Sequence, residues 1–171
     1  MPNRSDYEMA VRRLDAFAAS QNIKNAIVEY QSNNIYPLMY SGGRAVVYPV
    51  RVDGKRFALK CWIQDLGDLV DRYRAIDALL RNDRFSYMVE SVYYDEEILV
   101  NGVRYPALLM EWVDAPTLKQ WIDGGPGKAR LDRLAEEFLK MVASMHQRGL
   151  SHGDLQHENI PVSYTHLTLP T

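Results

Sequence analysis

Two β-type segments, Ala45 to Val52 and Arg56 to Trp62, stand on either side of the pair Asp53-Gly54. They contain the valines and aromatic residues that are common in strands. An Asp-Gly pair readily adopts the positive φ angles that a two-residue type I′ turn requires at both central positions. The pattern therefore predicts a β-hairpin over residues 45–62.

A second hairpin is predicted further along the chain. Met88 to Tyr94 and Ile98 to Val100 resemble strands, and Asn101-Gly102 forms a tight turn into Val103 to Trp112. Pro106 has no backbone N–H group, so it predicts an irregular or edge start of that last strand.

The N-terminal region is predicted to be helical. Ser5 or Asp6 can cap a helix that ends before Asn22. Its apolar residues recur at helical spacing: Tyr7, Ala10, Leu14 and Phe17. From Ile27 to Tyr40, asparagines and a proline interrupt the chain, so only short extended pieces are expected there.

Three further helices are expected. The first ends near Asn82 and is marked by apolar residues at helical spacing: Leu69, Tyr73, Ile76, Leu79 and Leu80. The glycines and proline of residues 124–127 separate a short helix, Leu118 to Ile122, from a long one, Ala129 to Arg148, which Gly149 caps. One broad apolar face is predicted on the long helix: Leu131, Leu134, Ala135, Phe138, Leu139, Val142 and Met145.

This order of elements, a mostly antiparallel sheet with one inserted helix and then further helices, predicts an α+β fold. The 171 residues are 47% hydrophobic, which is enough for a core, and the formal charge of −2 gives no indication of nucleic-acid binding. One cysteine, Cys61, excludes an intramolecular disulfide framework and fits a reducing cytoplasm. No apolar stretch approaches the roughly 20 residues that span a bilayer. We therefore expect a cytoplasmic domain with no membrane or nucleic-acid partner.

The strongest chemical signal is the segment 151–159, Ser-His-Gly-Asp-Leu-Gln-His-Glu-Asn, which follows the long helix. It fits the pattern H-x-D-x-x-x-x-N. Phosphoryl transfer to a hydroxyl needs a carboxylate that orients the hydroxyl and takes its proton, and it needs an oxygen ligand for a metal. Asp154 and Asn159 have the spacing to supply both. The alternative is a polar loop in which Asp154 only caps a helix.

Three upstream segments extend this pattern. Phe57-Ala58-Leu59-Lys60 fits a V-A-I-K strand, whose lysine grips phosphates. Residues 40–48 fit a glycine-rich loop poorly, because only Gly42 of the three signature glycines is present, although Val47 is in place. Leu108 to Val113 has the character of a hinge segment, with Met110 at its gatekeeper position; alone, it could equally be a buried edge strand.

Taken together, residues 40–160 resemble the protein-kinase superfamily. The resemblance implies ATP and Mg²⁺ as cofactors, a protein substrate, and Lys60, Asp154 and Asn159 as catalytic residues, with Asn159 on the metal. It implies the following nucleotide-binding residues: Gly42, Gly43, Val47, Ala58, Lys60, Met110, Glu111, Trp112 and Val113. It also implies an N-terminal helical extension (1–25), an ATP-binding small lobe with hinge (26–113) and the start of a helical large lobe through the catalytic loop (114–160).

The chain departs from the kinase pattern in two places. His152-Gly153-Asp154 lacks the arginine of H-R-D, and this form also occurs in aminoglycoside-type small-molecule kinases. The family usually offers a helix glutamate to pair with the lysine, but residues 65–84 contain none, so Asp77 and then Asp71 are the candidate substitutes. Three functions stay open: a Ser/Thr protein kinase, a small-molecule kinase, and a pseudokinase that binds nucleotide without catalysis.

Residues 161–171 are set apart from the fold. From Val162 onward they read as an in-frame translation of a transposase-type sequencing adapter, so we expect the native sequence to depart after Ile160. The D-F-G segment that holds magnesium in kinases does not occur in the chain. We therefore expect this fragment to be inactive alone.

Overall fold

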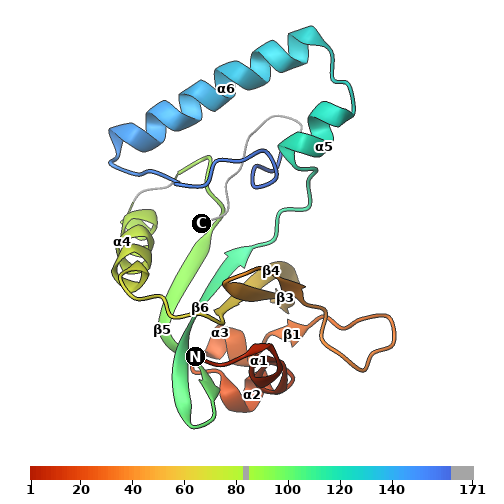
Figure 1. Cartoon of the computed structure of the whole chain (residues 1–171), viewed down its shortest axis with the longest axis vertical. Coiled ribbons are helices and arrows are strands. Elements are labelled where there is room, and N and C mark those ends of the chain that lie inside the picture. The colour runs from red at the N-terminus through yellow and green to blue at the C-terminus, as the bar shows by residue number, and fades with distance from the viewer. Residues whose placement is uncertain (83–84, 163–171) are drawn as a thin grey trace. The chain divides into compact units, whose positions relative to one another are not determined.

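The computed structural model describes residues 1–82 and 85–162, which form two compact units. The first unit comprises residues 1–82 and 90–112, and the second comprises residues 85–89 and 113–162. Each is described by itself below, with the elements labelled in Figure 1. No helix within the described ranges is both long enough and apolar enough to cross a membrane.

The first unit is a six-stranded antiparallel sheet with helices (Figure 1). The strand order is β1-β3-β4-β6-β5, and β2 pairs with β3. Its elements in chain order are α1 (Arg4–Val11), α2 (Leu14–Phe17), α3 (Gln21–Lys24), β1 (Ile27–Val28), β2 (Tyr40–Ser41), β3 (Ala45–Val52), β4 (Lys55–Trp62), α4 (Leu69–Asn82), β5 (Ser91–Val100) and β6 (Val103–Glu111).

Both predicted hairpins are present, and their turns have the predicted backbone conformation. Asp53 and Gly54 have φ of 49° and 80°, as do Asn101 and Gly102. Positive φ at both central positions is the property of a type I′ turn, whose twist matches that of the flanking strands. The two predicted strand pieces at 88–100 form one strand, β5, with an irregularity between Tyr94 and Ile98.

Pro106 lies inside β6 rather than at its start. It is opposite the β5 irregularity and one residue before Ala107, where pairing with β4 begins. The missing N–H group of Pro106 therefore falls where the ladder is interrupted, which explains how a proline fits a central strand. The expected irregularity is present, whereas an edge start is not.

One face of the sheet packs against the N-terminal helices and forms the larger core. Because side chains alternate along a strand, residues two apart share a face. The buried sheet residues on this face are Val46, Tyr48, Val50, Leu59, Cys61, Ile98, Val100, Ala107 and Leu109. Tyr7, Val11 and Ile23 of the helices pack against them. Burial, with a smaller contribution from Glu97, raises the pKa of the Cys61 thiol, so this cysteine is an inert core residue.

The N-terminal region forms three short helices rather than one continuous helix. Asn3 caps α1 in a capping box with Asp6, so the predicted cap at Ser5 or Asp6 lies too far along the chain. The helix stops before Arg13, whose backbone has left helical geometry. The break lets the chain turn and pack α2 and α3 on the sheet, and it leaves Phe17 partly exposed.

A buried carboxylate fixes this turn of the chain to the sheet. Glu97 on β5 is 1% exposed, and its Oε1 accepts hydrogen bonds from Ala19 N at 3.0 Å, Ser20 N at 2.9 Å and Ser20 Oγ at 2.9 Å. The residue next to Ala19, Ala18, forms a β-bridge with Ile98. A buried carboxylate is tolerated when hydrogen-bond donors are placed around it, so Glu97 specifies where the N-terminal segment crosses the sheet.

The second unit is helical. It contains α5 (Leu118–Asp123) and α6 (Lys128–Gln147), which the predicted glycine-rich segment separates. Thr117 and Gln120 form a capping box at α5, and Gly149, with φ of 70°, ends α6 as predicted. On α6 the buried residues are Met141 and Met145, whereas Leu139 is 68% exposed. Most of the predicted apolar face is therefore only partly covered by the described residues.

Replacing Glu97 with alanine should lower the free energy of unfolding by about 2–4 kcal/mol, because three donors lose their acceptor. The matched control is Glu96→Ala, one residue away and exposed, with an expected change within about 0.5 kcal/mol. Urea unfolding of both variants measures the difference. Equal losses would show that the Glu97 hydrogen bonds do not hold the N-terminal helices.

Candidate active-site residues

The second face of the sheet carries the predicted phosphate-binding lysine. Val47 on β3 lies directly opposite Lys60 on β4, which lies opposite Leu108 on β6. Directly opposed residues point to the same side of an antiparallel sheet. Ala58 and Met110 form the neighbouring row on this face. Strand register therefore brings the predicted apolar contacts and the predicted lysine onto one surface.

This surface has the composition that a nucleotide needs. Val47 and Met110 are half-buried and Ala58 is buried, so an apolar patch lies on the same face as Lys60. An apolar surface suits the faces of an adenine base, and an ammonium group suits its phosphates. The residues present fit the nucleotide that the sequence predicts.

At one end of this face, aromatic side chains from the strands and from α4 pack together. Trp62, Leu66, Tyr93 and Leu108 are buried in a second, smaller core, and Tyr73 of α4 packs against it. The Lys60 Nζ atom lies 3.5 Å from the Tyr73 hydroxyl. It is also 5.7 Å from the centre of the Trp62 ring and 5.8 Å from that of Tyr73. Lys60 is therefore surrounded by aromatic side chains on the α4 side.

The two candidate acidic partners of Lys60 are engaged elsewhere. Asp77 accepts a hydrogen bond from the backbone N–H of Tyr93 at 2.9 Å and pairs with Arg81 at 2.7 Å. Asp71 pairs with Arg74 at 3.0 Å. Within the described residues, neither carboxylate is paired with Lys60. Asp77 instead attaches α4 to β5.

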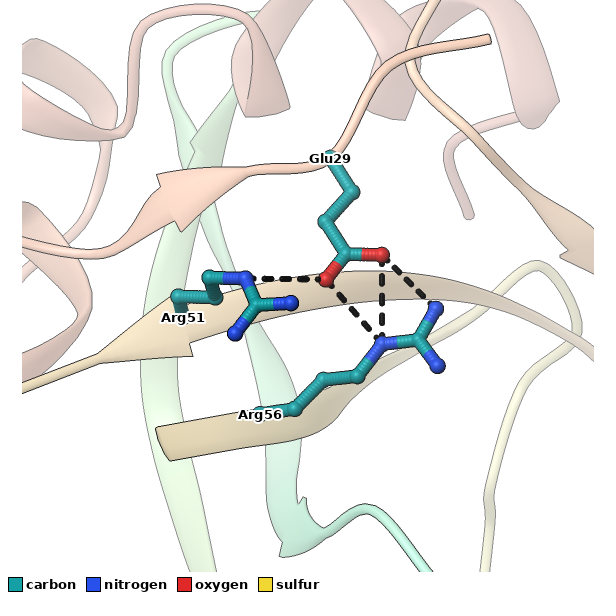
Figure 2. A network of polar contacts seen from close by, with 3 residues as sticks. All are labelled: Glu29, Arg51 and Arg56. Carbon is teal, nitrogen blue, oxygen red and sulfur yellow. Dashed lines mark hydrogen bonds and ion pairs between the residues drawn. The ribbon is translucent and has the colours of Figure 1, made fainter. Parts of the chain in front are cut away.

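The other end of the same face holds a network of charges that the sequence did not predict. Glu29 follows β1, and Figure 2 shows its carboxylate between the guanidinium groups of Arg51 and Arg56. Arg56 binds both carboxylate oxygens, with Nη2 to Oε2 at 2.7 Å and Nε to Oε1 at 3.0 Å, and Arg51 Nε is 3.3 Å from Oε1. This fork geometry is the strong form of an arginine–carboxylate pair.

The network continues to the predicted hinge. The Arg56 guanidinium lies 4.2 Å from the centre of the Trp112 ring, and the Arg56 carbonyl accepts a hydrogen bond from Trp112 N at 3.1 Å. Trp112 in turn contacts the ring of Tyr40, with centres 5.6 Å apart. Glu29 and Arg56 thus hold the residue that ends the first unit, immediately before Val113. The sequence feature that could have pointed to this network is Arg56, an arginine four residues before the predicted lysine.

The predicted glycine-rich loop is a tight connection between β2 and β3. Gly42 N donates to Ala45 O at 3.0 Å, which closes the loop. A Cβ atom added at Gly43 would meet nothing within 4 Å, and one at Gly42 would make only an ordinary contact with Ala45 O at 3.9 Å. These glycines are therefore not required by packing within the chain. Their small size leaves the loop backbone open to a ligand.

In the second unit, the loop with Asp154 is held at both of its ends. Leu150 N donates to Met145 O at the end of α6. Toward the end of the loop, His157 O accepts from Lys119 N at 3.1 Å, and Ile160 O just beyond it accepts from Leu118 N at 2.7 Å. Ile160 is buried. The N-terminus of α5 therefore fixes the return of the loop.

Asp154 and Asn159 are brought together by this loop. Asn159 Nδ2 donates to Asp154 Oδ2 at 2.7 Å, and Asp154 is exposed. This bond engages the amide nitrogen, so Asn159 has its Oδ1 oxygen available for a hard cation such as Mg²⁺. The described residues contain no group of three or more His, Cys, Asp or Glu placed to hold a metal. The oxygen donor fits magnesium as one ligand of a set, not as a complete site.

Gly153 has a conformational reason to be glycine. Its φ is +75°, in the left-handed region, and a Cβ atom there would meet nothing within 4 Å. A non-glycine residue would therefore be strained by its own backbone rather than by a neighbour. This explains the Gly of His152-Gly153-Asp154 as a requirement of this loop.

Comparison with known proteins relates the chain to a protein kinase. No protein-family model matches the chain. Over 136 residues it is 31% identical to the interferon-induced, double-stranded RNA-activated protein kinase of Rattus norvegicus. That match covers 70% of this chain and 26% of the rat kinase, so the chain spans about a quarter of that relative.

A solved structure establishes the fold. The crystal structure of Rad53 in complex with AMP-PNP matches the chain with a TM-score of 0.62 and 16% identity, over 86% of this chain and 39% of the Rad53 chain. At this identity the match concerns the fold alone. It confirms the predicted α+β class, an incomplete kinase-like fold with an antiparallel sheet and helices.

The backbone of Gly153 gives a test within the loop. Gly153→Ala should cost about 1 kcal/mol of stability in the second unit, because alanine disfavours positive φ. Gly43→Ala is the matched control: it adds the same methyl group into open space, at a residue outside the left-handed region. Hydrogen exchange of the 150–160 backbone measures local opening in each variant. Equal protection in both would contradict the left-handed conformation of Gly153.

Arg56→Lys should release Trp112, because lysine keeps the charge but cannot bind both Glu29 oxygens or stack as a plane. We expect a loss of about 1 kcal/mol and a change in the fluorescence of Trp112. Arg51→Lys is the control, since Arg51 makes one longer contact with the same carboxylate. If both variants behave alike, the fork between Arg56 and Glu29 does not support the hinge.

Proposed function

We propose that this chain, which belongs to the protein-kinase superfamily by its sequence match and its fold, is the ATP-binding part of an enzyme that phosphorylates protein Ser or Thr hydroxyls. The observation that carries the proposal is the register of β3, β4 and β6. It places Val47, Lys60 and Leu108 in one row, beside Ala58 and Met110. A nucleoside triphosphate has a flat base and anionic phosphates, so an apolar surface next to a cation suits it.

Within this proposal, the first unit binds the nucleotide. Val47, Ala58 and Met110 contact the base, and backbone groups of Glu111 and Val113 hydrogen-bond its edge. Trp112 contributes by holding that backbone through Arg56. Lys60 binds phosphate oxygens, and the open backbone at Gly42 and Gly43 lets the loop approach them.

The second unit contributes the chemistry at the acceptor. Asp154 orients the acceptor hydroxyl and takes its proton, while Asn159 steadies the carboxylate through its amide nitrogen and offers Oδ1 to magnesium. When bound, Mg²⁺ neutralises charge on the phosphates. Further ligands for the metal would come from sequence beyond the described residues.

The choice of a protein acceptor rests on similarity. The rat relative, whose match covers 70% of this chain, is by name a protein kinase. The glycine in His152-Gly153-Asp154, which suggested a small-molecule kinase, has a local explanation in the backbone of Gly153. We therefore favour a protein hydroxyl, and we place the enzyme in the cytoplasm on the strength of its single, buried cysteine.

Replacing Asp154 with alanine tests the assignment in a protein that carries this chain together with the remaining kinase sequence. Turnover should fall by about 10²–10⁴-fold, because the hydroxyl loses its base, while ATP affinity is kept. Asp132→Ala, an exposed carboxylate on α6 that pairs with Lys128, is the control and should leave turnover unchanged. Phosphate transfer from radiolabelled ATP to a generic protein acceptor gives the rate.

Three results would count against the proposal. Undiminished turnover in Asp154→Ala would remove the base from the mechanism. Transfer to aminoglycosides or sugars, with none to proteins, would establish the small-molecule alternative. Nucleotide binding without any transfer would favour a pseudokinase.

A further inference from the structure

We propose that Tyr73 takes the place of the missing acidic residue and positions Lys60 for phosphate binding. The proposal rests on the proposed function for the role of Lys60, but the contact itself does not depend on it. In this arrangement the lysine is held by a neutral aromatic enclosure formed by Trp62 and Tyr73 rather than by an ion pair.

The distances around Lys60 support this arrangement. Its ammonium nitrogen is 3.5 Å from the Tyr73 hydroxyl oxygen and lies within 6 Å of the centres of two rings, Trp62 and Tyr73. A phenol oxygen accepts a hydrogen bond from an ammonium group, and an aromatic face attracts a cation at this separation. The hydroxyl of Tyr73 and the ring of Trp62 therefore both act on one cation.

Tyr73 is itself fixed in place. Its ring stacks on Tyr93, with centres 5.6 Å apart and 13° between the planes, and it packs on Trp62 at 5.0 Å. Trp62 and Tyr93 also contact each other at 5.9 Å. The backbone N–H of Tyr93 is bound by Asp77 of the same helix as Tyr73. A side chain held on two sides in this way can direct a flexible lysine.

Tyr93, the phenol on which Tyr73 stacks, is neutral. Burial, with a smaller contribution from Asp95, raises the pKa of Tyr93 to about 12, so that phenol does not ionise at physiological pH. The nearby carboxylates are committed to other groups: Asp77 to Arg81 and the Tyr93 backbone, Asp71 to Arg74, and Asp95 to Arg74.

A neutral partner leaves more of the positive charge of Lys60 available to phosphates. In an ion pair, a carboxylate cancels much of the ammonium charge before the ligand arrives. With a phenol as partner, the charge of Lys60 is not cancelled, and orientation comes from packing. Tyr73 is thus a positioning residue that acts through Lys60.

The contact can be tested in the whole 171-residue chain by NMR without any ligand. The Lys60 ε-methylene protons, assigned by comparison with Lys60→Arg, should show nuclear Overhauser contacts to the Tyr73 and Trp62 rings and a ring-current shift. Tyr73→Leu should reduce that shift, and Tyr36→Phe, an exposed tyrosine substitution, should leave it unchanged. Absence of these contacts in the unsubstituted chain would overturn the proposal whether or not Tyr73→Leu folds.

The functional part uses titration of the same chain with Mg-ATP. Tyr73→Phe keeps the ring but removes the hydroxyl, so the Kd should rise about five-fold, as expected for one hydrogen bond. Tyr36→Phe should not change it. An unchanged Kd in Tyr73→Phe would contradict the positioning role. If the NMR contacts are present but the unsubstituted chain does not bind Mg-ATP, the proposed function fails while the contact stands.

Discussion

The register of the β3–β4–β6 ladder is the constraint on which the first unit depends. Strand side chains alternate with a period of two, so a shift of one residue would send Lys60 into the core and Cys61 to the opposite face. Two type I′ turns, at Asp53-Gly54 and Asn101-Gly102, fix the pairing of β3 with β4 and of β5 with β6. Both hairpins are local in sequence, so short-range turn chemistry decides which face carries the lysine.

The N-terminal helices decide which face of that sheet can meet a ligand. They pack over the core of one face, and Glu97 determines where they cross it, because its buried carboxylate accepts hydrogen bonds from Ala19 and Ser20. Only the face with Lys60 is left. That face is divided between aromatic packing under α4 and the Glu29–Arg56–Trp112 network at the other end. The apolar patch at Ala58 therefore lies between two rigid supports on the same sheet.

The sequence predicted features that depend on local chemistry and missed those that depend on tertiary contacts. Turn residues and apolar periodicity gave both hairpins, α4 and α6 to within a few residues. The break after α1 was missed because Leu14 and Phe17 continue the helical spacing while the backbone turns at Arg13. The predicted catalytic and nucleotide-binding roles stay predictions. A search for acidic residues could not find the proposed partner of Lys60, because that partner is a tyrosine. It is Tyr73, four residues before Asp77 and on the same face of the helix.

The aromatic contact of Lys60 also changes how α4 and the lysine are coupled. A charge pair between a helix and a strand can break and re-form in water at little cost, because exposed ion pairs contribute only about 0–1 kcal/mol. Tyr73 instead belongs to a packed group with Trp62 and Tyr93, in which each aromatic pair contributes about 0.5–1.5 kcal/mol beyond the area it buries. Moving α4 away would lose both pairs of Tyr73 and the Asp77 bond to Tyr93 together. Packing thus ties the lysine to a helix that resists displacement, where an ion pair would leave the helix free to act as a switch.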